Sequence, residues 1–293
     1  MNTKELMNLQ DGRKLEVIYN SGDLTSAVIF HHGTPSDANL WNSWLTFLES
    51  KGIGAISFSR AGYGNSHRQL GRTVVSVNED VQELIKRFGV ERFVAVGWSG
   101  GGPHAIANTL LRKCKGALTL AGVGAYGVSD LNFLEGMGEE NEIEFGAAVA
   151  GASELTKWMD TNAVDFAKVT AEDLKQALGG LISQPDKDLL FDSYANEMAA
   201  TFQSALEHGY WGWFDDDMAF VQNWGFELSE VEKPVELWQG DQDLMVPHAH
   251  GIWLEKHVPN AKLVFKPGEG HLSLGENSKE EISKAIVAML ERS

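Results

Sequence analysis

The sequence predicts an α/β fold in which a mostly parallel sheet is flanked by helices and interrupted by an inserted helical cap. In the first 124 residues, short apolar runs that suit strands buried on both faces alternate with segments of helical periodicity. The alternation stops near residue 125 and resumes near residue 233. Because strands that alternate with helices are typical of a parallel sheet, we expect both outer parts to build one sheet.

The elements of the first part follow in a regular order. A hairpin is expected first, with its turn at Asp11-Gly12. The later strands are predicted at 26–33, 54–60, 92–98 and 116–122. Helices are predicted at 37–50 and 78–89, because apolar residues recur there at helical spacing.

The middle part, 125–232, contains helical stretches rich in acidic residues and no convincing strand. These stretches lie at 153–169, 171–182 and 186–209. A strand, a helix, a further strand and a final helix are then predicted at 234–243, 250–258, 261–271 and 279–293. A core formed by 1–124 and 233–293, with 125–232 as a helical cap, accounts for the length better than two tandem domains.

Composition limits the partners. The chain has 24 Lys and Arg against 41 Asp and Glu, a net charge of −17, which opposes binding to nucleic acid or to anionic membranes. The single cysteine, Cys114, excludes an internal disulfide and fits a reducing compartment. The sequence contains no signal-like start and no apolar run near the ~20 residues of a membrane span. We therefore expect a cytoplasmic protein that binds neither nucleic acid nor a membrane, and the sequence does not indicate its oligomeric state.

A glycine-rich turn stands where a predicted strand meets a predicted helix. Residues 97–101 read Gly-Trp-Ser-Gly-Gly and fit the pattern G-x-S-x-G, in which the serine occupies a sharp, strained turn with its hydroxyl exposed. Glycines at positions 97 and 101 avoid a side chain where the strand and the helix approach each other. We therefore predict that Ser99 is a nucleophile rather than part of a generic turn.

A serine hydroxyl needs a base that takes its proton and an acid that orients the base. In the order Ser, acid, His, His271 is the best placed of the nine histidines, because it follows a predicted strand near the C-terminus. The preceding strand ends in Gly-Asp-Gln-Asp, where Asp243 is the favoured acid and Asp241 is expected to structure the turn. Packing or surface roles are expected for three histidines in or beside a helix: His248, His250 and His257.

Donors for an oxyanion are predicted in two turns. One is the backbone N–H of Gly100, which follows the nucleophile. The other is the N–H of Thr34 in the sequence His-Gly-Thr-Pro at 32–35, where a predicted strand ends and Gly33 is expected to let the backbone turn. His32 itself is expected to be a structural residue of this loop.

Five motifs in this order, HHGTP, SRAGYGNS, GWSGG, GDQDLMVP and GEGH, resemble those of the α/β-hydrolase superfamily over about two thirds of the chain. The resemblance implies a mostly parallel sheet of about eight strands with a helical cap, and neither a cofactor nor a metal. Its pattern G-x-x-D-x-x-V-P falls on 240–247 and favours Asp243 as the acid. Ser59 and Ala61 stand where relatives carry Asp and Pro, in a structural loop outside the catalytic residues.

The type of nucleophile indicates the reaction. Haloalkane dehalogenases and epoxide hydrolases of this architecture use Asp at the turn, so Ser99 implies acyl transfer. We expect a serine hydrolase that cleaves a small carboxylic ester through an acyl-enzyme. A proline iminopeptidase-like aminopeptidase is the alternative, although those enzymes read His-Gly-Gly-Pro-Gly where this chain has HGTPS. A non-catalytic ligand-binding protein of this fold would have no chemical need for all three residues of a triad.

The predicted cap contains aromatic residues at 210–226 around three consecutive acids, Asp215 to Asp217. The aromatic residues are expected to anchor the cap while the acids are solvated. Alternatively, they line an apolar pocket beside Ser99, or the carboxylates receive the ammonium of an aminoacyl substrate. The candidate substrate-binding residues are Trp98, Trp211, Trp213 and Asp215.

Two further patterns are weaker. Gly122, Gly124 and Gly127 form G-x-G-x-x-G, but the chain enters the predicted cap instead of continuing a βαβ unit, so a flexible hinge is favoured over a dinucleotide site. The sequence Pro-His-Ala-His at 247–250 lies near Asp243, but a zinc site would need a further ligand. We predict neither a dinucleotide nor a metal.

Overall fold

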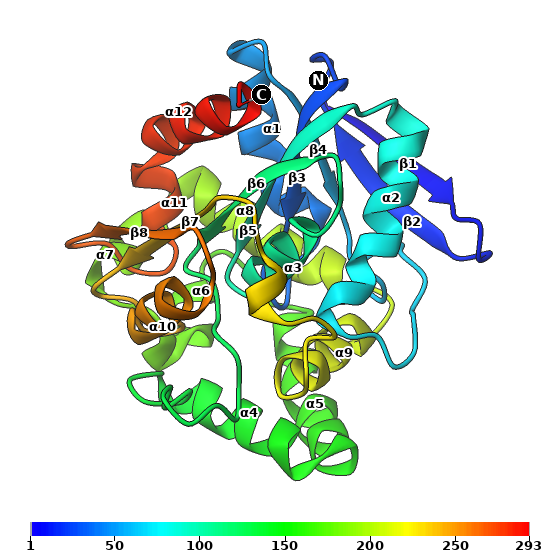
Figure 1. The fold of residues 1–293 in the computed structure, drawn as a ribbon. Helices are drawn as coiled ribbons and strands as arrows, with labels where there is room; N and C mark the ends of the chain where they lie inside the picture. Colours follow the sequence, from blue (N-terminus) through cyan, green and yellow to red (C-terminus); the bar gives the residue numbers. More distant parts are fainter. Residues whose placement is uncertain (1, 293) are drawn as a thin grey trace.

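The computed structural model describes residues 2–292, and for residue 192 the backbone alone. Eight strands form one sheet in the order β1-β2-β4-β3-β5-β6-β7-β8 (Figure 1). The strands are β1 (Thr3–Asn8), β2 (Lys14–Tyr19), β3 (Ser26–His31), β4 (Gly54–Phe58), β5 (Arg92–Trp98), β6 (Cys114–Leu120), β7 (Val235–Gly240) and β8 (Ala261–Lys266). The β1–β2 and β2–β4 pairs are antiparallel and the other pairs are parallel. The predicted fold class, a mostly parallel eight-stranded sheet, is confirmed.

The sheet is buried on both faces. In β3, Ala27 and Ile29 belong to one hydrophobic cluster while Val28 and Phe30 belong to another, and all four are fully buried. Successive side chains of a strand point to opposite faces. This is why the strands read as continuous apolar runs rather than as alternating ones.

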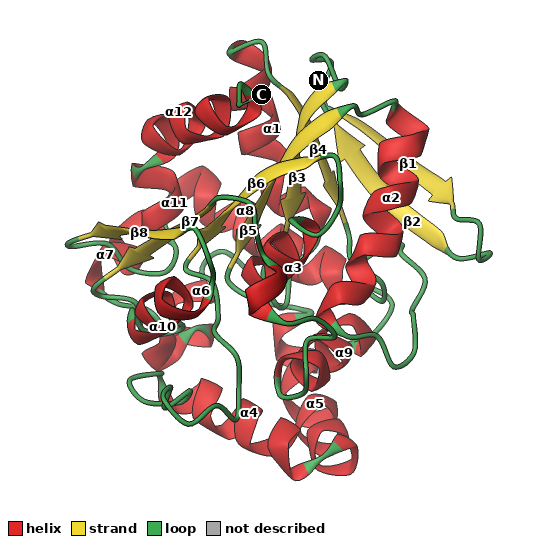
Figure 2. Cartoon of the chain, in the orientation of Figure 1, coloured by secondary structure: helices red, strands yellow, loops and turns green. Residues whose placement is uncertain are grey.

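Helices cover both faces of the sheet, as Figure 2 shows. On one face lie α2 (Val77–Phe88), α3 (Gly101–Asn108) and α10 (Ala249–His257). On the other lie α1 (Asn42–Ser50), α11 (Ser273–Asn277) and α12 (Lys279–Leu290). The 3-10 turns η1 (Ala38–Trp41) and η2 (Val74–Ser76) precede α1 and α2. Helix α2 has the expected end signals, since Glu79 and Asp80 lie in its first turn and Gly89 follows it with a φ of 66°.

The chain between β6 and β7, residues 121–234, is called here the helical segment. It contains α4 (Glu139–Ala150), α5 (Ala152–Phe166), α6 (Leu174–Ala177), η3 (Gly179–Leu181), α7 (Gln184–Leu189), α8 (Asp192–Ala205), α9 (Trp211–Phe220) and η4 (Leu228–Glu230). Helices α4 and α5 lie beyond one end of the sheet, at the bottom of Figure 1. The stretch predicted as helical over 186–209 is divided into α7 and α8, because Leu190 leaves the helical conformation with ψ 64°. Helices α4 and α9 lie in the part of the chain predicted to be helical, but outside the three stretches predicted there as individual helices.

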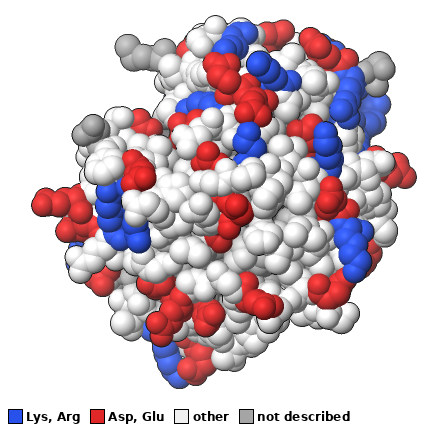
Figure 3. All heavy atoms as spheres, turned by 90° about the vertical axis from the view of Figure 1, so that its left-hand side faces the viewer, with Lys and Arg blue, Asp and Glu red and all other residues white. Residues whose placement is uncertain are grey.

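The surface drawn in Figure 3 carries Lys and Arg interspersed among Asp and Glu, without a continuous basic patch on that face. Across residues 2–292, no helix combines the length and the apolar character that crossing a bilayer would require.

Candidate active site

Ser99 occupies the turn between β5 and α3 in a strained conformation. Its φ is 55°, which a residue with a side chain rarely adopts. The turn is held from both sides, because Ser99 N–H donates to the carbonyl of Leu120 (2.9 Å) and the Ser99 carbonyl accepts from the N–H of Gly102 (2.9 Å). Ser99 itself remains partly exposed. The surrounding structure thus fixes a strained serine at the end of a strand, as a nucleophile turn requires.

Two glycines permit this turn by providing space. A Cβ on Gly97 would overlap the carbonyl of Gly101, and a Cβ on Gly101 would overlap the carbonyl of His31. Neither glycine has a positive φ. Close backbone approach, rather than flexibility, therefore explains why glycine stands at both positions.

His271 and Asp243 meet at the ends of the last two strands. The carboxylate of Asp243 accepts a hydrogen bond from His271 Nδ1 (2.8 Å to Oδ2), and both residues are buried. The same carboxylate is oriented by the N–H groups of Met245 (2.9 Å) and Val246 (2.8 Å). Because an ionised carboxylate can only accept, Nδ1 carries the proton and Nε2 is left as an acceptor.

His271 Nε2 is buried and has no hydrogen-bond partner among the described residues. It lines the same cavity as Ser99. The indole of Trp98 donates from Nε1 to the carbonyl of His271 (3.1 Å), and the two rings lie 5.0 Å apart. His271 is thus held in the cavity that Ser99 lines, with Nε2 free to accept a proton.

Asp186, which no sequence signal indicated, holds the loop that carries His271. It is fully buried in the helical segment and lies 85 residues earlier in the chain. Its carboxylate accepts from the N–H groups of His271 (3.0 Å), Leu272 (2.8 Å) and Ser273 (3.0 Å). A Cβ on Gly270 would overlap this carboxylate. Asp186 therefore holds the backbone of residues 271–273 in place.

Thr34 and Gly100 lie side by side at the cavity. A Cβ on Gly100 would overlap Thr34 Oγ1, and both residues line the cavity with Ser99. Neither N–H group has an acceptor among the described residues. Gly33 has no positive φ; instead, a Cβ there would lie 2.6 Å from the Trp98 ring. Contrary to the expectation from the sequence, Gly33 is therefore not needed to turn the backbone. Glycine is needed there because a side chain would overlap the Trp98 ring.

The loop around Thr34 is fixed by His32 and Arg60. Burial and the neighbouring Arg60 lower the pKa of His32 well below its usual value, so the ring is neutral. Its Nδ1–H donates to the Gly33 carbonyl (2.8 Å) while Nε2 accepts from the N–H of Arg60 (2.9 Å). The Arg60 guanidinium donates to the carbonyls of His32 and Gly33. The expected structural role of His32 agrees with these contacts.

Asp216 of α9 anchors the helical segment to this loop. It is fully buried and pairs with Arg60 (2.6 Å) and Arg72 (2.6 Å). It also accepts from Thr34 Oγ1 (2.7 Å) and from the hydroxyl of Tyr63 (2.8 Å). Burial opposes ionisation, but the two arginines outweigh it and hold the pKa of Asp216 well below its usual value. Asp216 is therefore a buried anion rather than a solvated acid.

The cavity is walled mostly by apolar and aromatic side chains, and more of these come from the helical segment than from the rest of the chain. Its lining includes Thr34, Pro35, Trp98, Ser99, Gly100, Val123, Asn141, Glu144, Phe145, Phe166, Leu178, Leu181, Met198, Phe202, Trp213, Asp217, Phe220, Met245, Val246, His271 and Leu272. A concave, largely apolar site with a few polar groups is typical of small-molecule binding.

Two of the predicted substrate-binding residues, Trp98 and Trp213, line this cavity, and two do not. Asp215 is paired with Arg68 (2.7 and 2.8 Å), and the Arg68 guanidinium lies 4.1 Å from the ring centre of Trp211. Trp211 is exposed and Asp215 is buried against Arg68. Consecutive residues of a helix point about 100° apart, so Asp215 lies on another side of α9 than Asp217, and neither Trp211 nor Asp215 lines the cavity.

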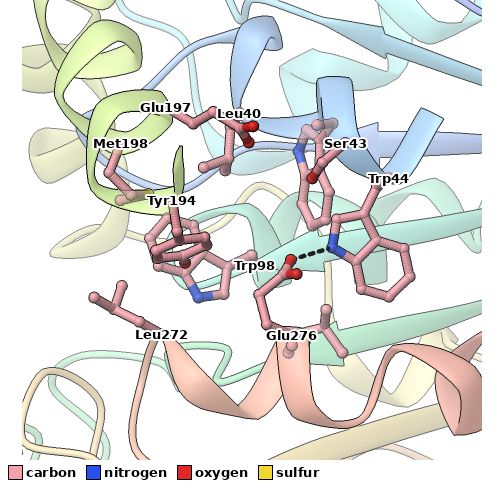
Figure 4. A pocket seen from close by; sticks show the side chains of 12 residues that line it. Leu40, Ser43, Trp44, Trp98, Tyr194, Glu197, Met198, Leu272 and Glu276 are labelled. Atoms are coloured by element: carbon pink, nitrogen blue, oxygen red, sulfur yellow. Dashed lines mark hydrogen bonds between the residues drawn. The ribbon is translucent and has the colours of Figure 1, made fainter. Parts of the chain in front are cut away.

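A second cavity lies behind Trp98. Trp98, Met198 and Leu272 line both cavities, so these side chains form the shared wall. Figure 4 shows this second cavity with Tyr194 facing Trp98 and with Trp44, whose Nε1 donates to Glu276 (3.1 Å).

The weaker sequence patterns have structural explanations. The N–H of Gly124 donates to His250 Nδ1 (2.9 Å), and His250 Nε2 bonds to the carbonyl of Phe133 (3.0 Å), so this buried histidine packs the chain that leaves β6. Asp241 accepts from the N–H of Gly268 (2.7 Å), as a turn residue would. Within residues 2–292 no group of three or more His, Cys, Asp or Glu is arranged to hold a metal ion.

Comparison with known proteins adds to this geometry. Residues 26–278 match the family model described as alpha/beta hydrolase fold. A non-heme haloperoxidase from Rhodococcus erythropolis is 25% identical, with 87% of this chain and 89% of the relative covered. A 2-hydroxy-6-oxononadienedioate/2-hydroxy-6-oxononatrienedioate hydrolase from Pseudomonas putida is 24% identical, with coverages of 94% and 92%.

Among solved structures, the esterase RhEst1 from Rhodococcus sp. ECU1013 is similar with a TM-score of 0.70 at 14% identity, covering 99% of both chains. At this identity the likeness concerns the fold. Because the similar proteins carry names of different reactions, the reaction has to be argued from the residues of the cavity.

Proposed function

This chain belongs to the α/β-hydrolase fold family, and on that premise we propose that it is a serine hydrolase that cleaves a small carboxylic ester through an acyl-enzyme. One observation carries the proposal: His271 is bonded to Asp243 through Nδ1 and presents a free Nε2 to the cavity that Ser99 lines. A nucleophile, a base and an orienting acid are the three groups that acyl transfer by serine needs.

In the first half of the proposed reaction, Ser99 Oγ attacks the ester carbonyl while His271 Nε2 takes its proton. The negative oxygen of the tetrahedral intermediate receives hydrogen bonds from the N–H groups of Thr34 and Gly100, each of which is typically worth ~10²–10³ in rate. The intermediate collapses, and His271 returns the proton to the departing alcohol. Asp243 holds the ring in the tautomer that this transfer needs and stabilises the imidazolium.

In the second half, a water molecule attacks the acyl-enzyme while His271 again takes a proton. The same two N–H groups stabilise the second intermediate. Its collapse releases the carboxylic acid and returns the proton to Ser99. No step needs a cofactor or a metal, so the residues of the chain account for the whole cycle.

The cavity also bears on the substrate. The Pseudomonas putida relative acts, by its name, on a dioate, which carries two carboxylates. Among the described residues that line this cavity there is no Lys or Arg to pair with a second carboxylate, whereas Glu144 and Asp217 would repel it. We therefore do not extend the dioate substrate to this protein.

An aminoacyl substrate is the second candidate, favoured by the two acids Glu144 and Asp217 in the cavity wall. It would use the same Ser99 chemistry on an amide. Comparing aminoacyl anilides with esters of the same acyl group separates the two. Faster turnover of the anilides would make the protein an aminopeptidase, and tight binding of one ligand without turnover would make it a binding protein.

Fluorophosphonate labelling tests the proposed function. We expect one adduct on Ser99 in the folded protein, and we expect Ser99→Ala to abolish it and to lower kcat for ester hydrolysis by a factor on the order of 10⁴ or more. Ser43→Ala, in the neighbouring cavity, is the matched control and should keep both the adduct on Ser99 and the kcat of the wild type. An adduct that persists in Ser99→Ala would refute the assignment of the nucleophile.

A further inference from the structure

The wall of the catalytic cavity carries two carboxyl groups that the proposed reaction does not use. Glu144 of α4 and Asp217 of α9 line the same cavity as Ser99. Asp217 is fully buried, and among the described residues no N–H or hydroxyl donates to either of its oxygens. Asp217 instead shares a side-chain hydrogen bond with the Glu144 carboxyl. Because a buried carboxyl that receives no N–H or hydroxyl of the protein is costly, a ligand with N–H donors would stabilise this pair.

The surroundings of Asp217 contain no spare positive charge. Its neighbour Asp216 already pairs with Arg60 and Arg72. Burial, followed by the repulsion of Glu144, raises the pKa of Asp217 well above its usual value, and burial raises the pKa of Glu144 to about 7. The two carboxyls therefore share a proton near neutral pH, and a cation bound between them would replace that proton.

Other groups of the cavity suit a cation with several N–H donors. Asn141 donates from Nδ2 to the carbonyl of Met245 (3.0 Å), which leaves its amide oxygen as an acceptor on the same helix as Glu144. Glu144 is partly buried and is oriented by Trp213, whose Nε1 donates to it (2.6 Å). The aromatic rings of Phe145 and Trp213 line the same wall, and aromatic faces attract ammonium groups.

We propose that Glu144 and Asp217 form a subsite for the protonated amine of an ester substrate. This inference rests on the proposed function of Ser99 and adds a substrate class to it. The two carboxyls and the amide oxygen of Asn141 would accept the N–H donors of the amine, while the chain between the amine and the ester would contact the aromatic wall. A substrate with a carboxylate at the same end is rejected by repulsion.

Matched esters test the subsite. We propose to measure kcat/KM for 4-nitrophenyl 6-aminohexanoate and its uncharged isostere 4-nitrophenyl heptanoate, and for shorter pairs of the same design. A second series places the amine in the alcohol part. We expect at least one amine ester to be preferred over its isostere about tenfold or more, the size of a charge-assisted hydrogen bond. Equal or faster turnover of the neutral isostere in every pair would overturn the proposal.

Substitutions of Glu144 and Asp217 test whether these two residues cause the preference for amine esters. Asp217→Asn and Glu144→Gln should each reduce the amine preference, the ratio of kcat/KM for the amine ester to kcat/KM for its neutral isostere, about tenfold. Glu142→Gln, an exposed acid on the same helix, is the matched control and should keep the preference. An amine preference that survives in both pocket variants would also overturn the proposal. Thermal unfolding of each variant verifies that it is folded.

Failure of the subsite can be told apart from failure of the proposed function. In Ser99→Ala, which cannot form the acyl-enzyme, calorimetry measures binding of hexylammonium against that of hexanol and hexanoate. The subsite predicts saturable binding of hexylammonium alone, and loss of that binding when Asp217→Asn is added. Equal binding of hexanol and hexylammonium would refute it even if Ser99 is labelled. Selective ammonium binding without any ester turnover would refute the esterase and keep the subsite.

Discussion

The helical segment between β6 and β7 meets the rest of the molecule in two regions that use carboxylates in opposite ways. At its junction with the loops after β3 and β8, Asp186 and Asp216 are each surrounded by donors. At the wall of the cavity, Asp217 has no N–H or hydroxyl donor among the described residues, and Glu144 faces it as a second acid. Asp186 and Asp216 are thus held by donors of the protein, whereas Asp217 shares a hydrogen bond with a second carboxyl, Glu144, which in turn accepts from Trp213 Nε1.

The difference teaches how a row of similar residues can serve different purposes. Asp215, Asp216 and Asp217 are consecutive, but α9 turns them toward Arg68, the junction and the cavity respectively. Acids that are fully paired position neighbouring loops. An acid that lines a cavity without an N–H or hydroxyl donor retains its capacity to bind a ligand.

Asp216→Asn should have the largest effect on the junction. It would leave Arg60 and Arg72 buried with one acceptor fewer, and breaking a buried ion pair typically costs about 3–5 kcal/mol of the free energy of unfolding. Urea unfolding measures this loss. Asp215→Asn removes a pair whose carboxylate is buried but whose Arg68 side chain stays partly exposed, so it should cost less, about 1–2 kcal/mol. Equal losses in the two variants would contradict the distinction between the junction and the Arg68 pair.

Asp186→Asn should affect the reaction more than the fold. One carboxylate oxygen that accepts from the backbone of His271 is replaced by a donor, so the base should be displaced and kcat should fall about tenfold with little change in KM. The rate of fluorophosphonate labelling should fall by a similar factor. Asp188→Asn, exposed on the same helix, serves as the comparison. A variant with lowered stability but unchanged kcat and labelling rate would show that Asp186 does not position the base.

A further effect concerns pH. Because the pKa of Glu144 is raised from its ordinary value of 4.5 to about 7, the folded state holds a proton that the unfolded state releases in this range. The Glu144 contribution to the free energy of unfolding therefore decreases as pH rises from 4.5 to about 7. The groups that face this pair, Asp216 and Arg72, stay charged throughout.

The difference in stability between Glu144→Gln and the wild type isolates this contribution. As pH rises from 4.5 to about 7, the free energy of unfolding of the variant should increase relative to that of the wild type. Urea unfolding at several pH values measures this difference. The contribution of Asp216, which pairs with Arg60 and Arg72, changes with pH in the opposite direction. Because the pKa of Asp216 is lowered, its charge stabilises the fold except at strongly acidic pH. A stability difference that is constant with pH would mean that the two carboxyls do not share a proton.

Much of the fold could be predicted because its signals are local. Apolar runs and helical spacing placed the strands and the flanking helices, and the turn at Ser99 was visible in its glycines. The helices of the helical segment were placed less well. Helix α9 has apolar, aromatic and acidic residues on all sides, since eight of its ten residues are buried, and it therefore lacks the one-sided pattern that indicates a surface helix.

The sequence by itself determined the fold class and the candidate residues Ser99, Asp243 and His271, because each stands in a motif at a strand end. Only the tertiary structure decided which carboxylate meets which partner. Asp186 reaches the backbone of His271 across 85 residues, and Asp217 faces Glu144 rather than water. The physical reason is that pairing and burial of a charge depend on what packs against it in space, and residue type and local spacing do not carry that information.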